Sequence, residues 1–123
     1  MKEVDGFLIG YPLSVGVKLE RKNGRPFTNV GHKVCWHSPD GFEWGYSGSG
    51  PADLALNILE AYAHLIKKPK GGWVLCRTGK CTKMSADLHQ KFKAEVVANI
   101  PEKGGIIASE KIVGWIDENW DGI

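Results

Sequence analysis

The sequence predicts an α+β protein in which a small antiparallel sheet packs on a central helix, with two further helices at the C-terminal end. Three patterns support this: apolar and polar residues alternate within the first 46 residues, a long apolar segment follows Pro51, and two amphipathic segments end the chain. A chain of 123 residues, 42% hydrophobic and 24% charged, has the size and composition of one globular domain. We therefore expect a single domain over residues 1–123.

The strands are expected before the first helix. Apolar and polar side chains alternate over Ser14–Arg21, and the Asn23-Gly24 pair that follows is typical of a type I′ hairpin turn, so a second strand should begin near Phe27. The same period of two predicts strands at His32–His37 and Phe42–Tyr46. We therefore expect four or five antiparallel strands.

The first helix has the clearest sequence signals. Pro51 favours the first helical position, with Ser49 or Gly50 as the cap, and the apolar run continues to about Ile66. Apolar residues cover most of its circumference, which indicates a buried helix. Its few polar side chains recur at helical spacing and form one narrow stripe: Asp53, Asn57, Glu60 and His64.

Two more helices are expected in the last third of the chain. Ser85 should cap the second helix, whose apolar stripe ends before Pro101. The third begins at Ser109 and buries apolar residues within Ile112–Ile116. Strands followed by helices are the element order of an α+β protein.

Residues 67–83, the basic segment, lie between the first two helices. They include six basic residues and no acidic one, around a short apolar run that begins at Trp73, and we expect a β-hairpin or loop with Thr78-Gly79 at its bend. A positive surface with an exposed tryptophan can bind single-stranded nucleic acid, a nucleotide or an acidic protein surface. The alternative is a solvated group of lysines that maintains solubility.

The overall charge identifies no partner. Sixteen basic and 14 acidic residues give a net charge of +2, which gives no global argument for nucleic acid or an anionic membrane. The charge is divided instead, because residues 67–93 hold eight basic and one acidic residue, whereas residues 94–123 hold two and six. Charges, glycine and proline interrupt the start of the chain before an apolar signal or membrane span can form, so we expect a cytoplasmic protein without membrane contact, in the host cytoplasm if a phage encodes it.

The loop Gly45–Pro51 is a candidate anion site. Unpaired N–H groups and the dipole at a helix N-terminus attract phosphate or carboxylate groups. The segment matches neither the P-loop nor the dinucleotide-binding glycine pattern, and its glycines could instead only permit a tight turn and close packing. Trp44 and Tyr46 beside it could stack on a base or belong to an aromatic core face. Glu43, on the opposite face, is either solvated or the polar anchor of a site.

The remaining reactive side chains form no recognisable active site. Three cysteines are an odd number, which argues against a secreted disulfide scaffold and for reduced thiols. Cys76-x4-Cys81 and Cys35-x-His37 have zinc-ligand chemistry, whereas ordinary thiols and a surface or core histidine are the alternative. No nucleophile is arranged recognisably with a base and an oxyanion hole, so we expect no enzyme, no bound metal and no cofactor.

One motif is specific enough to compare with known families: Phe42-Glu43-Trp44-Gly45-Tyr46, then Gly48-Ser49-Gly50-Pro51-Ala52, then Leu54-Ala55-Leu56. It resembles a family of small proteins of unknown function from bacteria, archaea and their phages. The resemblance extends back to Ser38-Pro39 and, more weakly, forward to Phe92-Lys93 and the final helix. It implies a shared fold core and a phage or mobile-element setting, with the basic segment as an insertion, and it implies no mechanism.

Together, these observations predict a non-enzymatic binding protein of phage or mobile-element type that interferes with a host or defence component. It would bind a phosphorylated small molecule or an anionic surface, and its partner would be a host or defence protein or that protein's nucleotide ligand. Two alternatives stay open: a protein–protein inhibitor similar to anti-CRISPR proteins, and a non-specific binder of single-stranded nucleic acid. The expected binding residues are Glu43, Trp44, Tyr46, Gly48, Ser49, Gly50, Lys67, Lys68, Lys70 and Trp73.

Overall fold

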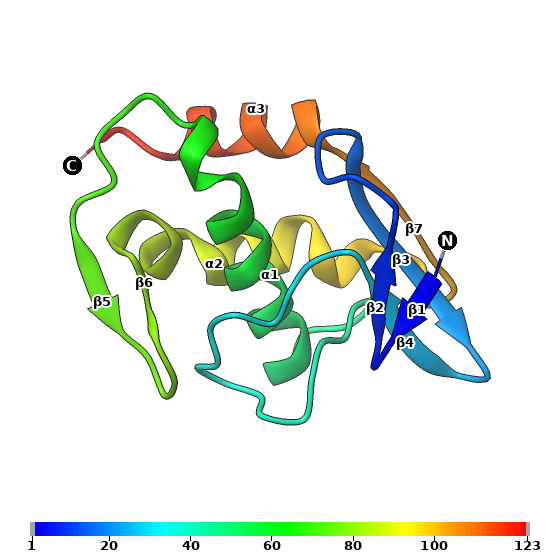
Figure 1. Ribbon diagram of the computed structural model, residues 1–123. Coiled ribbons are helices and arrows are strands. Elements are labelled where there is room, and N and C mark those ends of the chain that lie inside the picture. Colours follow the sequence, from blue (N-terminus) through cyan, green and yellow to red (C-terminus); the bar gives the residue numbers. More distant parts are fainter. Residues whose placement is uncertain (1, 123) are drawn as a thin grey trace.

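The computed structural model describes residues 2–122 and has an α+β fold, as the sequence predicts. A five-stranded sheet and a two-stranded hairpin lie on opposite sides of the molecule, with the helices between them (Figure 1). The three α-helices of the described chain are α1 (Ser49–Tyr62), α2 (Lys83–Glu95) and α3 (Ser109–Asn119).

The main sheet is mixed, whereas the sequence pattern predicts an antiparallel one. Its strand order is β1-β2-β4-β3-β7. Strands β2 and β4 run parallel through the pair Phe7 and Thr28, and the other neighbours are antiparallel. The strands are β1 (Lys2–Val4), β2 (Phe7–Ile9), β3 (Gly16–Lys22), β4 (Arg25–Thr28) and β7 (Gly104–Ala108).

Two tight turns of the same kind shape this sheet. Asn23 and Gly24 have φ values of 53° and 78°, so the predicted turn between β3 and β4 has the two positive φ angles that a type I′ turn requires. Asp5 and Gly6, with φ values of 45° and 86°, form a matching turn between β1 and β2. This second hairpin is not among the elements predicted above, although Asp-Gly is a strong turn signal.

The strands predicted at His32–His37 and Phe42–Tyr46 are wrong. Both segments are irregular, apart from one isolated bridge between Cys35 and Thr78. In the first segment, backbone N–H groups donate to side chains of α1 instead of to a neighbouring strand. The sheet is completed by β1, β2 and β7.

Helix α1 differs from its prediction at both ends. Gly48 is the N-cap, with an extended backbone and no side-chain cap hydrogen bond, so Pro51 occupies the third helical position rather than the first. The α-helix ends at Tyr62 and continues as a 3₁₀ turn, η1 (Ala63–Leu65). A proline within the first turn removes an N–H that has no partner inside the helix, so either position is tolerated.

The second helix begins three residues earlier than predicted, and the third begins as predicted. The Thr82 hydroxyl, rather than Ser85, caps α2 by accepting from the Ser85 N–H at 3.2 Å. Helix α2 is followed by a 3₁₀ turn, η2 (Val97–Asn99), and α3 starts at Ser109. Over residues 2–122, no helix has the length and apolar character needed to cross a membrane.

The basic segment forms the second sheet, which confirms the hairpin prediction. Strands β5 (Trp73–Leu75) and β6 (Lys80–Thr82) are antiparallel, and Gly79 in the turn has a φ of 81°. Val74 and Cys81 face inward, where they pack with Val34 and Leu56. This packing attaches the hairpin to α1 and to the loop before it.

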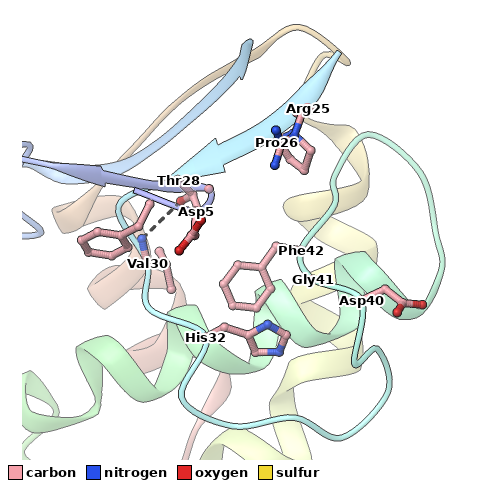
Figure 2. Close-up of a pocket in the computed structure, with 11 residues that line it drawn as sticks. Asp5, Arg25, Pro26, Thr28, Val30, His32, Asp40, Gly41 and Phe42 are labelled. Atoms are coloured by element: carbon pink, nitrogen blue, oxygen red, sulfur yellow. Dashed lines mark hydrogen bonds between the residues drawn. The ribbon is translucent and has the colours of Figure 1, made fainter. Parts of the chain in front are cut away.

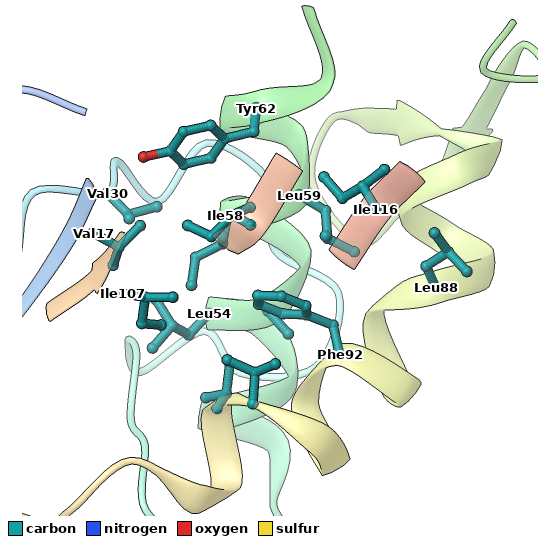
Figure 3. Packing of buried hydrophobic residues seen from close by; sticks show 14 of the residues in the cluster. Val17, Val30, Leu54, Ile58, Leu59, Tyr62, Leu88, Phe92, Ile107 and Ile116 are labelled. Carbon is teal, nitrogen blue, oxygen red and sulfur yellow. The ribbon is translucent and has the colours of Figure 1, made fainter. Parts of the chain in front are cut away.

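The main core lies between the sheet and the three helices. Apolar side chains from each layer meet there (Figure 3), and the ones drawn with labels are Val17, Val30, Leu54, Ile58, Leu59, Tyr62, Leu88, Phe92, Ile107 and Ile116. Leu54 and Ile58 of α1 are fully buried, as the apolar pattern of that helix predicts.

Candidate functional site

The glycine loop 45–50 is shaped by close packing. Gly45 has a φ of 84° and donates its N–H to the Val97 carbonyl at 3.1 Å. A Cβ on Gly45 would lie 3.1 Å from the Ile100 carbonyl oxygen, and a Cβ on Gly50 would lie 2.9 Å from the Cβ of Glu43. Both glycines are therefore required by the turn and its neighbours.

The aromatic residues of the loop divide between core and surface. Trp44 is 1% exposed, and its indole N–H donates to the Glu102 carbonyl at 3.0 Å. Arg21 lies 4.3 Å from the Trp44 ring centroid and forms a 2.8 Å ion pair with Glu43. Trp44 is thus a core residue, Glu43 is held by a cation, and Tyr46 is half-exposed.

The structure separates the two halves of the expected binding site. One half, at the start of α1, consists of Gly48, Ser49 and Gly50, and the lysines follow the other end of that helix. At 1.5 Å per residue, a helix of 14 residues spans roughly 20 Å. The glycine loop and the basic segment are therefore two separate surfaces.

Two of the three predicted lysines stabilise the fold. Lys68 donates to the carbonyls of Asp117 and Trp120 at 2.8 and 2.7 Å, where a positive charge is favourable at the C-terminal end of α3. Lys70 donates to the Ile66 carbonyl near the end of η1. Lys67 is exposed.

Asp53 organises the loop that precedes the glycine loop. Its side chain is fully buried, Oδ1 accepts from the His37 N–H at 2.9 Å, and Oδ2 accepts from the Ser38 N–H at 2.9 Å. The Trp36 N–H donates to both oxygens at 3.2 Å. One carboxylate thereby satisfies three consecutive backbone N–H groups that form no ladder with a strand.

Asn57, one helical turn later, continues the same attachment. Its Oδ1 accepts from the N–H groups of Lys33 and Val34 at 2.9 and 3.0 Å, and its Nδ2 donates to the Val34 carbonyl at 2.8 Å. Glu60 accepts from the hydroxyls of Thr82 and Ser85 at 2.7 and 2.6 Å. Three of the four residues of the polar stripe of α1, Asp53, Asn57 and Glu60, therefore attach neighbouring segments to the helix, whereas His64 is exposed. Their position on an apolar helix could have indicated this role.

His37 and His89 form a pair that no spacing in the sequence indicates. Their Nε2 atoms lie 2.9 Å apart, and Nδ1 of His89 lies 2.8 Å from the Ala86 carbonyl. A carbonyl can only accept, so Nδ1 of His89 carries the proton and its Nε2 accepts from His37. Trp36 stacks on both rings at 5.2 and 5.1 Å. Burial lowers the pKa of His89 from its usual value.

This lowered pKa predicts a loss of stability in weak acid. The unfolded His89 takes up a proton near pH 6.5, whereas the folded one takes it up only at lower pH, so the unfolded state binds more protons between the two values. The stability that the buried, neutral His89 contributes is therefore complete above about pH 6.5, and it is lost as pH falls from there toward the pKa of the folded state. The free energy of unfolding of His89→Gln, measured by urea titration between pH 7.5 and 5, should depend less on pH than that of the wild type. His64→Gln, at an exposed position, should keep the wild-type slope, and an equal slope in His89→Gln would contradict this account.

The three thiols do not form the zinc set considered from the sequence. The Sγ atoms of Cys76 and Cys81 lie 3.4 Å apart across the hairpin, whereas Cys35 lies near Asp53 and His37 faces His89. Burial raises the pKa of Cys81 to about 12, and burial together with the Asp53 carboxylate raises the pKa of Cys35. Both thiols are therefore protonated near neutral pH, which disfavours them as nucleophiles.

The outer face of the hairpin exposes large apolar side chains. Trp73 and Leu75, two residues apart on β5, are 64% and 82% exposed. Lys80 is paired with Leu75 across the strands, and its ammonium lies 5.2 Å from the centroid of the Trp73 ring. We call Trp73, Leu75 and Lys80 the hairpin face.

A cavity of about 400 Å³ adjoins the hairpin face. It lies between the hairpin and the end of α1, and Lys70 and Glu60 place opposite charges in its wall. Its lining consists of Glu60, Ala63, His64, Lys70, Gly72, Trp73 and Thr82. Trp73 therefore belongs both to the exposed face and to a concave surface.

Comparison with known proteins adds one finding. No curated protein and no solved structure shows significant similarity to this chain. A family model does match, over a region that begins before β3 and ends at the start of the basic segment, so it contains the motif at 42–56 but not Phe92 or α3. This region, residues 10–67, is similar to a family of unknown function, DUF6166.

Proposed function

We propose that this protein is a non-enzymatic binding protein whose hairpin face docks on an acidic surface of another protein. The observation that supports the proposal most strongly is the exposure of Trp73 and Leu75, at 64% and 82%, on one side of a two-stranded hairpin. Adjacent large apolar side chains in water are typical of interaction sites, and tryptophan is enriched among residues that dominate binding energy.

The charge of the basic segment supports a partner with an acidic surface. Residues 67–83 carry six basic side chains and no acidic one, and Arg77 and Lys80 are exposed on the hairpin. A partner with acidic groups around an apolar patch would complement this surface in charge and polarity. The cavity beside Trp73 could receive one of the partner's side chains. That the partner is a host or defence protein stays a prediction.

A phosphorylated small molecule fits this geometry less well. Such a ligand needs a concave site where N–H groups and cations converge. Gly48, Ser49 and Gly50 line none of the three cavities described for residues 2–122. The lysines that were expected to assist them follow the opposite end of α1.

Single-stranded nucleic acid is the second candidate, because an exposed tryptophan among cations is the usual platform for stacking a base. Two features favour a protein instead. The ammonium group of Lys80 lies over the ring of Trp73, where a base would stack. The exposed side chain of Leu75 has no group that could form a hydrogen bond or stack with a base.

Capture experiments with a double variant test this function. The wild type and the double variant Trp73→Ala/Leu75→Ala would be immobilised separately. Each would be incubated with nuclease-treated lysate of the cells that encode the protein, and the bound proteins would be quantified by mass spectrometry. A specific acidic partner should be enriched on the wild type and lost from the double variant. With that partner purified, calorimetry should give an affinity at least about 30-fold weaker for the double variant, because truncating one interface hot spot costs about 2 kcal/mol.

A matched control removes an exposed apolar side chain elsewhere. Ile106, on β7, is 55% exposed, and Ile106→Ala should bind like the wild type. All variants change exposed residues, so their thermal midpoints should remain close to that of the wild type. Equal capture by the wild type and the double variant would refute the proposal. A labelled single-stranded oligonucleotide would be tested in parallel. If it alone were bound, with an affinity that falls steeply with salt, the nucleic-acid alternative would replace the protein-binding proposal.

A further inference from the structure

Three side chains with metal-binding chemistry converge at the loop that precedes α1. They are His32, Cys35 and Asp53, and one donor atom of each lies within 4.8 Å of a donor atom of the other two. The imidazole Nε2 of His32 is 3.6 Å from Oδ2 of Asp53. No other group of three histidine, cysteine or acidic donors within residues 2–122 is this close.

The arrangement is built into the fold. Asp53 is held by three backbone N–H groups, which fix the direction of its carboxylate while Oδ2 faces His32. Asn57 binds the backbone of Lys33 and Val34, which lie between His32 and Cys35. Hydrogen bonds that orient ligands in this way are what metal sites use to hold their first coordination sphere.

The buried carboxylate has little compensating charge. Asp53 is fully buried, and His32 is the only basic side chain paired with it among the residues that the structure describes. An ionised carboxylate in a protein interior normally requires a paired charge or a metal ion. A divalent cation could be held here by the Asp53 carboxylate, the Cys35 thiolate and a neutral His32. The two negative charges of these ligands would then balance the two positive charges of the ion.

We propose that His32, Cys35 and Asp53 bind a zinc ion. Nitrogen, sulfur and oxygen ligands together match the preference of Zn²⁺, whereas Ca²⁺ and Mg²⁺ take oxygen ligands and Cu⁺ favours several soft sulfur ligands. Binding converts the Cys35 thiol to a thiolate, and its proton passes to solvent. Three protein ligands leave the fourth tetrahedral position for water or for a donor from a bound molecule.

One of the three proposed ligands, His32, borders a cavity of about 300 Å³ (Figure 2). His32 lies in the wall of this cavity beside Phe42. The two ring centroids are 4.2 Å apart, so the phenyl ring packs against the imidazole and restricts its orientation. Asp40 and Arg25 contribute charges elsewhere in the lining. The proposed site therefore adjoins this cavity on the side of His32, while Asp53 on its other side is fully buried.

Cobalt substitution tests this proposal, because a Co²⁺–thiolate bond gives an intense charge-transfer absorption in the near ultraviolet. The full-length protein, reduced and stripped of metal, would be titrated with Co²⁺ and then with Zn²⁺ against a chromophoric chelator. The wild type should show the absorption and lose it when Zn²⁺ displaces Co²⁺. Cys35→Ser should abolish the absorption, and His32→Gln should weaken Zn²⁺ affinity at least about 100-fold, since even outer-sphere substitutions cost 10–100-fold.

The other potential ligands provide the controls. Cys76→Ser/Cys81→Ser removes the paired thiols of the hairpin, and His89→Gln breaks the histidine pair, so both variants should retain the absorption and the affinity. His32 and Cys35 are partly exposed, so their variants should stay folded, which circular dichroism checks. The proposal is overturned if the wild type shows no absorption, or if Cys35→Ser retains it. It is also overturned if the double cysteine variant loses it, which would place the metal on the hairpin.

Discussion

Asp53→Ala is expected to lower the free energy of unfolding by about 3 kcal/mol or more, because it removes a buried carboxylate that accepts from three backbone N–H groups. The N–H groups of Trp36, His37 and Ser38 would lose their acceptor, and the loop would have to open to water to regain one. Urea titration in the presence of a chelator measures this effect free of any metal contribution.

Hydrogen exchange should localise the change. In Asp53→Ala, the amides of residues 36–38 should exchange much faster, while the amides of α2, which form bonds within that helix, should change only as far as global stability does. Ser49 is an exposed residue of α1, the helix that also contains Asp53. The free energy of unfolding of Ser49→Ala should therefore lie within about 0.5 kcal/mol of that of the wild type. A loss below about 1 kcal/mol in Asp53→Ala would show that the loop is held by other contacts.

Gly104→Ala is expected to be similarly damaging for a different reason. Gly104 begins β7 with a φ of 105°, and a Cβ there would lie 2.2 Å from the carbonyl oxygen of Leu19 on β3. Neither strand can yield without breaking the β3–β7 ladder, so we expect a loss of about 3 kcal/mol or more in the free energy of unfolding, seen in the urea midpoint.

Two other glycines, one beside Gly104 in β7 and one in α3, serve as matched controls. A Cβ on Gly105 or on Gly114 would meet nothing within 4 Å. Gly105→Ala should therefore be nearly neutral, and Gly114→Ala, inside α3, should stabilise the protein by about 0.5–1 kcal/mol through its higher helix propensity. If Gly104→Ala were as mild as Gly105→Ala, the close approach of β7 to β3 would be refuted.

The elements that the sequence predicts well are those determined by neighbouring residues. Asn23-Gly24 requires positive φ at two successive residues wherever it occurs in a hairpin, and the apolar run after Pro51 can be buried only as a helix of that length. Asp5-Gly6 has the same local cause, so the first hairpin was equally predictable.

The incorrect strands show where local pattern fails. His32–His37 alternates as a strand does, yet its backbone N–H groups find acceptors on Asp53 and Asn57 of a helix that comes later in the chain. Alternation describes which side chains are apolar, and it does not say where the backbone hydrogen bonds go. The sequence pattern likewise predicts no strand after Pro101, although Gly104 and Gly105 begin the strand that lies against β3.

The candidate sites divide in the same way. The positive charge of the basic segment follows from composition, because six cations without an acidic residue among them cannot all be buried. Which lysines are free does not follow, since Lys68 is used to cap a helix nearly fifty residues away. The convergence of His32, Cys35 and Asp53 likewise depends on the docking of a loop onto α1.

The sequence by itself thus determined the fold class, the central helix, one hairpin turn and the basic character of residues 67–83, each of which depends on interactions between near neighbours. Only the tertiary structure decided the mixed sheet, the separation of the glycine loop from the lysines and the grouping of donors around Asp53. The physical reason is that a buried carboxylate or a backbone N–H takes whichever partner the packing of distant segments brings within hydrogen-bond distance, and that choice leaves no local pattern.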